Sequence, residues 1–109
     1  MILINADIIS KLKNNWGDKA ESLACMAELR VYDPLSDWQC YIYAMNPDNE
    51  DEIMCLISGG KNVEPITTEW ALSEMELLYN SDGEGVEIDK EYRPRRTDEL
   101  FKILNQGFR

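Results

Sequence analysis

Residues 80–91, NSDGEGVEIDKE, contain the residue types of a calcium-binding loop. An EF-hand loop places oxygen ligands at positions 1, 3 and 5, a glycine at position 6 and a bidentate glutamate at position 12. Counted from position 80, the chain supplies a match at each of these places: Asn80, Asp82, Glu84, Gly85 and Glu91. The first chemistry to consider is therefore the coordination of a hard divalent cation by oxygen.

The flanking residues argue against an EF-hand. The helix that should leave the loop is interrupted at once, because Pro94 lies three residues beyond Glu91. Position 8 is apolar in paired loops but is Glu87 here, and the sequence offers no second loop. We interpret the stretch as a glycine-rich turn that leads into a strand over 85–92. A calcium-binding or other metal-binding module remains the alternative.

The other reactive residue types favour a protein without a catalytic site. The chain contains no histidine, which excludes Ser-His and Cys-His nucleophile pairs and removes the usual zinc ligand. We predict a non-enzymatic protein with no catalytic residue, no metal and no cofactor. Three cysteines lie in apolar runs without a Cys-x-x-Cys pair, so we expect buried free thiols, with a reactive role as the alternative: Cys25, Cys40 and Cys55.

Charge is the strongest bulk signal in the 109-residue chain, whose formal net charge is −10. Residues 46–91 hold 13 acidic and 2 basic residues, whereas residues 92–109 hold 5 basic and 2 acidic residues. Such a field repels phosphate, so we expect no direct binding of nucleic acid by the middle of the chain. It would attract a basic protein surface instead.

Two groups of carboxylates could form a binding face in the acidic segment. In a strand over 85–92, Glu87, Asp89 and Glu91 would project from the solvent face at intervals of about 6.6 Å. This spacing is close to the rise of about 6.8 Å for two nucleotides of one DNA strand, so the row could act as a DNA mimic. The alternative is a solvated face that only confers solubility. The second group lies on a predicted turn: Asp48, Glu50, Asp51 and Glu52.

An aromatic run over 38–45, WQCYIYAM, predicts a strand that is apolar on both faces. Tyr41 and Tyr43 share one face, while Cys40 and Ile42 share the other. Such a strand is usually covered on both sides by other elements, which we expect here. In the alternative, Tyr41 and Tyr43 are exposed and form part of a partner-binding surface.

The remaining pattern predicts a single α+β domain over residues 1–109. Asn5 is a good N-cap for a first helix that ends at Gly17, and Thr97 is a good N-cap for a C-terminal helix. Pro65 favours an edge strand over 63–70, followed by a short helix over 72–80. Strands over 23–32, 38–45 and 53–58 complete a four- to five-stranded, mostly antiparallel sheet with N-terminal, short middle and C-terminal helices.

The order of these features resembles a small uncharacterised family, number 2958 among the domains of unknown function. Its members are carried largely by bacterial plasmids, phages and other mobile elements. The resemblance rests on Trp38 and Tyr41 and on three stretches, EDEIMCLISGG, EWALSEMELL and GEGVEID, although Ile88 stands where the family tends to have arginine. It implies a mobile-element origin and a helix-flanked antiparallel sheet. It implies no activity and no site residue, because the family has no established function.

These observations lead to an expected function in the cytoplasm of a bacterial host. The chain has no apolar run of membrane-spanning length and no signal-peptide pattern. We expect an acidic inhibitor of a basic, nucleic-acid-handling defence protein, such as a CRISPR effector or a restriction enzyme. An anti-CRISPR or anti-restriction protein of this kind would make no membrane contact. A structural accessory protein without inhibitory activity is a further alternative.

Overall fold

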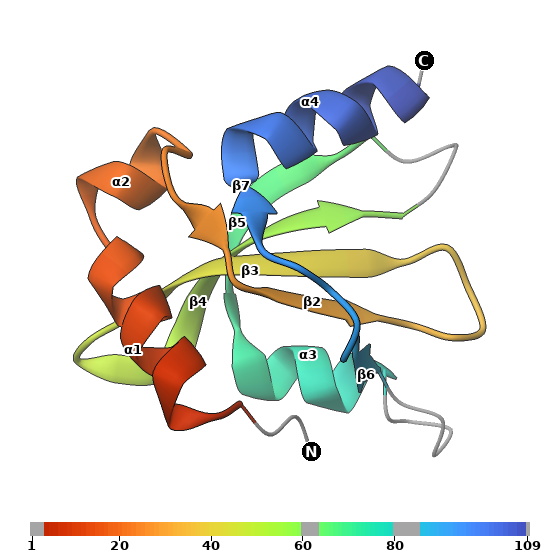
Figure 1. The fold of residues 1–109 in the computed structure, drawn as a ribbon. Helices are drawn as coiled ribbons and strands as arrows, with labels where there is room; N and C mark the ends of the chain where they lie inside the picture. The colour runs from red at the N-terminus through yellow and green to blue at the C-terminus, as the bar shows by residue number, and fades with distance from the viewer. Residues whose placement is uncertain (1–3, 60–63, 80–85, 109) are drawn as a thin grey trace.

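The computed structural model describes residues 4–59, 64–79 and 86–108, which form an α+β fold (Figure 1). Within these ranges, five strands form one antiparallel sheet in the order β5-β4-β3-β2-β6, and β1 pairs with β7 in a separate sheet. The predicted fold class and the positions of its three predicted helices are confirmed. In chain order the elements are α1 (Ala6–Asn15), α2 (Asp18–Glu21), β1 (Met26–Ala27), β2 (Leu29–Tyr32), β3 (Gln39–Asn46), β4 (Asn49–Ser58), β5 (Ile66–Ala71), α3 (Leu72–Tyr79), β6 (Glu87–Ile88), β7 (Arg95–Arg96) and α4 (Thr97–Phe108).

The centre of the sheet is a meander of successive antiparallel strands, which agrees with the antiparallel sheet predicted from the sequence. The β3–β4 hairpin closes through the pair Asn46 and Asn49, and the backbone N–H of Asp48 donates to Asn46 Oδ1 at 2.9 Å. The expected turn over 48–52 is wrong, because only Pro47 and Asp48 lie in the turn. The acids that follow lie on β4 itself.

Two hydrophobic cores lie on the two faces of the sheet, and β3 contributes to both. Cys40 and Ile42 pack in the core that includes Leu12 of α1 and Met75 of α3. Tyr41 and Tyr43 pack in the other core, which includes Ala20 of α2 and Leu100 of α4. The tyrosines are 7% and 1% exposed, so the prediction of a covered strand is confirmed and the exposed-aromatic alternative is wrong.

The first helix follows the prediction, but the next segment does not. The Asn5 side chain accepts a hydrogen bond from the Ile8 N–H at 2.9 Å, and Gly17 has a φ of 106°, which favours glycine. A further short helix, α2 at Asp18–Glu21, then occupies residues for which no element was predicted. Its end is fixed by Leu23 at φ 58° and by the Ala24 N–H, which donates to Lys19 O at 2.9 Å. The strand expected over 23–32 therefore begins only at Met26 and is divided into β1 and β2.

The prediction that the cysteines are buried is confirmed, and the backbone of Cys25 also holds the beginning of the C-terminal helix. All three cysteines are free and buried, and desolvation raises the pKa of Cys25 and of Cys40, which disfavours a reactive thiolate. The hydroxyl of Thr97 donates to Cys25 O at 2.9 Å, and the Thr97 N–H donates to the same oxygen. Thr97 is thus the first residue of α4 and a buried anchor.

Candidate functional site

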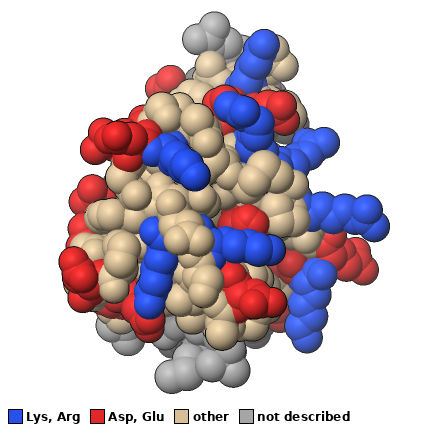
Figure 2. Space-filling view, turned by 60° about the vertical axis from the view of Figure 1, so that its left-hand side comes forward, with Lys and Arg blue, Asp and Glu red and all other residues tan. Residues whose placement is uncertain are grey.

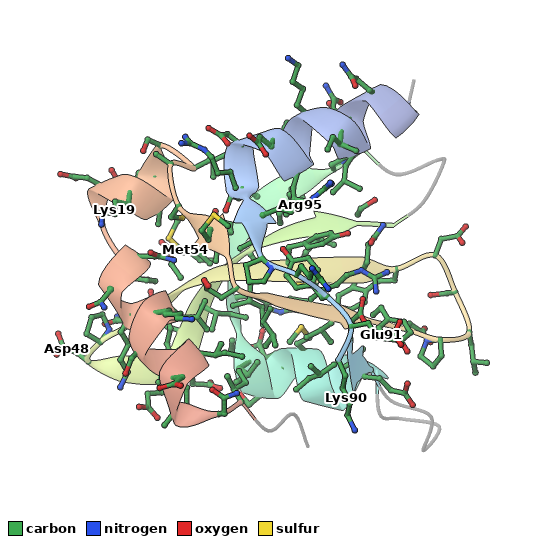
Figure 3. All side chains as sticks on the ribbon, in the orientation of Figure 1. Lys19, Asp48, Met54, Lys90, Glu91 and Arg95 are labelled. Atoms are coloured by element: carbon green, nitrogen blue, oxygen red, sulfur yellow. The ribbon has the colours of Figure 1, made fainter. Side chains whose placement is uncertain are left out.

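The two predicted groups of acids lie at opposite ends of the sheet. Glu87 pairs with Tyr32, which in turn pairs with Gln39 at the beginning of β3. Asp48 follows the other end of β3, and Figure 3 shows Asp48 and Glu91 on opposite sides of the molecule. The structure therefore does not bring the two groups together on one surface.

At the β6 end, the expected row of three carboxylates is wrong. The strand ends at Ile88, and Lys90 and Glu91 lie in a turn. The Asp89 carboxylate accepts from the Glu91 N–H at 3.0 Å and from Arg30 Nη1 at 2.8 Å. Since the Arg30 and Asp89 side chains are each only 25% exposed, Asp89 is not a free member of a solvent-facing row.

Arg30 is the centre of a polar network at this end. Its Nε donates to Gln39 Oε1 at 3.1 Å, and the Tyr41 hydroxyl donates to the same oxygen at 2.7 Å. The guanidinium carbon lies 5.0 Å from the centroid of the Tyr32 ring, within the range of a cation–π contact. The Tyr32 hydroxyl donates to Glu87, and this hydrogen bond raises the pKa of Tyr32. Two of the three predicted acids therefore take part in the fold.

At the hairpin end, three of the four predicted acids also have partners within the chain. Glu50 forms an ion pair with Lys13 of α1. Glu52 accepts from Asn46 Nδ2 at 2.9 Å. Asp51 accepts from both the N–H and the hydroxyl of Ser73, at 2.8 and 2.9 Å, and so satisfies a free donor in the first turn of α3. Asp48 is exposed at the tip of the hairpin.

A shallow groove of about 380 Å³ lies between β4, β5 and the first turn of α3. Four carboxylates line it, two of which the sequence did not single out, Glu69 and Glu74. All of its lining residues lie in the described part of the chain, and none of them is a lysine or an arginine. The lining consists of Asn49, Asp51, Glu52, Glu69, Trp70, Ala71 and Glu74.

Strand register creates this groove. Glu52 pairs with Ala71 and Met54 pairs with Glu69, so the beginning of β4 lies beside the end of β5. α3 starts directly after Ala71 and carries Glu74 to the same place. The acidic excess of residues 46–91 was a signal for such a surface, but the register that assembles it is not readable from the sequence.

The groove can attract a cationic group such as a guanidinium or an ammonium. Carboxylates that gather around one hollow produce a local negative potential and accept charge-assisted hydrogen bonds. Trp70 supplies an apolar wall that is held by an edge-on contact with Trp38, at 6.3 Å between ring centroids. The aliphatic stem of a lysine or an arginine could pack against such a wall.

A metal site is a separate question. In residues 4–59, 64–79 and 86–108, no group of three or more His, Cys, Asp or Glu side chains is arranged to hold a metal ion. Asn80, Asp82, Glu84 and Gly85 of the calcium-like loop lie outside the described residues.

Basic side chains gather on one face of the molecule together with acidic ones. On the face seen in Figure 2, Lys and Arg side chains lie in the middle and on the right with Asp and Glu side chains between them, and further Asp and Glu side chains lie along the left margin. Arg93 and Arg95 are exposed just before α4, and Arg96 forms an ion pair with Asp98 at 2.8 Å. That contact raises the pKa of Arg96 and lowers the pKa of Asp98.

No protein-family model, curated protein or solved structure matches this chain. The resemblance to an uncharacterised family of mobile elements stays a prediction. None of the described helices combines the length and the apolar character needed to cross a membrane.

Proposed function

We propose that this protein is a non-enzymatic acidic binding protein that inhibits a basic, nucleic-acid-handling protein of a bacterial host. The proposed target is a protein such as a CRISPR effector or a restriction enzyme. The observation that carries the proposal is the convergence of Asp51, Glu52, Glu69 and Glu74 on one groove without a basic lining residue. The formal net charge of −10 acts in the same direction.

Electrostatics supplies the mechanism. A nucleic-acid-binding channel presents many lysines and arginines, and an acidic protein is steered toward it at a raised on-rate. Once the protein is bound, the end of the sheet that carries the groove occupies the channel and excludes the nucleic acid. Since Glu87, Asp89 and Glu91 do not form a phosphate-like row, competition depends on the charged groove and not on a regular copy of a DNA strand.

The proposal is tested with immobilised protein and a bacterial lysate, at low and at high salt. The matched variants are Glu69→Lys with Glu74→Lys in the groove, and Asp7→Lys with Asp18→Lys, which are exposed on α1 and α2. Both pairs change the net charge equally. Wild type and the helix variant should retain a basic nucleic-acid-handling protein at low salt and release it at high salt, because salt screens exposed charges.

The captured protein is then purified and its activity on nucleic acid is measured with the wild type added. Inhibition by wild type that the groove variant lacks would support the proposal. Equal capture by the groove and helix variants, or full activity of the captured protein in the complex, would contradict it.

A further inference from the structure

β5 is an outer strand of the sheet with a regular backbone. It pairs with β4 over six consecutive residue pairs, from Glu52 and Ala71 to Ile57 and Ile66, without a register shift. No other strand in the described ranges pairs with its outer edge. Alternate N–H and C=O groups of such an edge point away from the sheet and form a template for a further strand.

Some of the devices that usually protect an edge are absent from the described part of this strand. β5 contains no bulge and no lysine, and Pro65 precedes Ile66 without interrupting the strand. The side chains leave room on both faces, since Ile66 is 52% exposed and Thr67 and Glu69 are also exposed. A second chain could therefore approach the edge without displacing a covering element of the described structure.

Charge selects the kind of chain that fits. Glu69 is exposed on β5, Glu64 is exposed just before the strand, and Glu74 of α3 extends this acidic border beyond Ala71 into the groove. A second copy of this protein would bring the same acids to the edge, and like charges across a strand pair are destabilising. An extended segment rich in lysine or arginine would instead meet opposite charges at Glu64, Glu69 and Glu74.

We propose that the β5 edge receives an extended basic segment of the partner as a sixth strand and that the segment places its cationic side chains in the acidic groove. Main-chain hydrogen bonds would supply affinity, and the groove would select for positive charge. This inference rests on the proposed function, because it names the way in which a basic partner is held.

The test uses a synthetic octapeptide of alternating lysine and threonine and a second peptide of the same sequence that is N-methylated at every residue. The two carry the same charge, but the second cannot donate backbone hydrogen bonds. Titrated into isotope-labelled protein, the first should shift the amide signals of residues 66–71 and slow their hydrogen exchange. The methylated peptide should bind about tenfold more weakly or worse.

Protein variants test the same edge from the other side. Adjacent residues of a strand direct their N–H groups to opposite edges, so one of Thr67→Pro and Thr68→Pro removes an outward donor while the other removes a bond to β4. The variant with the smaller loss of melting temperature should lose about tenfold or more of the affinity for the unmethylated peptide. Thr67→Val serves as the control for loss of the hydroxyl.

The outcomes separate this inference from the proposed function. Equal affinity for the two peptides, or binding by both proline variants at the wild-type level, would show that charge alone docks the segment and would overturn the inference. No binding of either peptide would overturn it as well. A dimer that forms at high salt, where the repulsion between the acids of two copies is screened, and that is lost in a proline variant would assign the edge to a second copy and overturn the inference. The proposed function fails separately, if the groove variant captures the same host protein as wild type.

Discussion

The two ends of the sheet are both acidic in sequence, yet the fold uses them differently. At the β6 end, Arg30 lies against Asp89 and the Tyr32 hydroxyl donates to Glu87, so these carboxylates stabilise the chain. At the other end, Asp51 and Glu52 also have partners within the chain, but Glu69 and Glu74 join them around a groove that no basic side chain lines. The difference shows that the role of a carboxylate depends on the neighbours that strand register supplies and not on the local density of acids.

Removal of Arg30 should give the largest change in stability. In Arg30→Ala, the half-buried Asp89 loses its partner and Gln39 loses a donor, so we expect a loss of about 1–2 kcal/mol in the free energy of unfolding. Urea denaturation measures it, with the adjacent exposed Lys90→Ala as the control. An additive double-mutant cycle between Arg30→Ala and Asp89→Ala would contradict a structural role for the pair.

Asp51 should show a smaller effect, because it combines a structural contact with a place in the groove. Asp51→Ala leaves the Ser73 N–H without its partner in the first turn of α3, and we expect a loss of about 1 kcal/mol. Asp48→Ala, at the exposed hairpin tip, should be nearly neutral when the two variants are compared by thermal unfolding. Equal losses in the two variants would mean that the contact with Ser73 does not hold α3.

Neutralisation of the groove should hardly change stability, in contrast to the β6 end. We expect Glu69→Gln with Glu74→Gln to change the free energy of unfolding by about 0.5 kcal/mol or less. At low salt the variant should be slightly more stable than wild type, because repulsion between neighbouring acids is relieved. This gain in stability should disappear at high salt. A clear destabilisation would reveal a structural partner of these acids and would remove the contrast between the two ends.

Tyr32 should report the contact at the β6 end through its titration. Its hydroxyl donates to Glu87, which raises its folded pKa, so the stabilising contribution is present below the unfolded value and is lost as pH rises through the folded pKa. Glu87→Gln should move the Tyr32 titration toward lower pH in an NMR experiment. Tyr43 and Tyr92, whose pKa values burial raises to about 12, should be unaffected.

The sequence predicted the elements of this fold better than their contacts. Aromatic and apolar runs identified β3 and β4, and Asn5 marked the first helix, because both signals depend on local residue preference. The predicted row of Glu87, Asp89 and Glu91 is wrong because β6 ends at Ile88 and a turn follows. Asp89 contacts Arg30, which lies 59 residues away in the chain, and the local sequence does not show such a contact. Glu69 and Glu74 were missed because only the pairing of β4 with β5 brings them to the groove.

The central claim is that the acids of the groove bind a basic partner while those of the β6 end do not. The most direct test compares Glu69→Lys with Glu74→Lys against Glu87→Lys with Glu91→Lys, which change the net charge equally at the two ends. Calorimetric titration against the captured host protein at low salt gives the two dissociation constants. The account predicts a loss of affinity of about tenfold or more for the groove pair and of about threefold or less for the β6 pair. Equal losses would show that only net charge matters, and a larger loss at the β6 end would contradict the account.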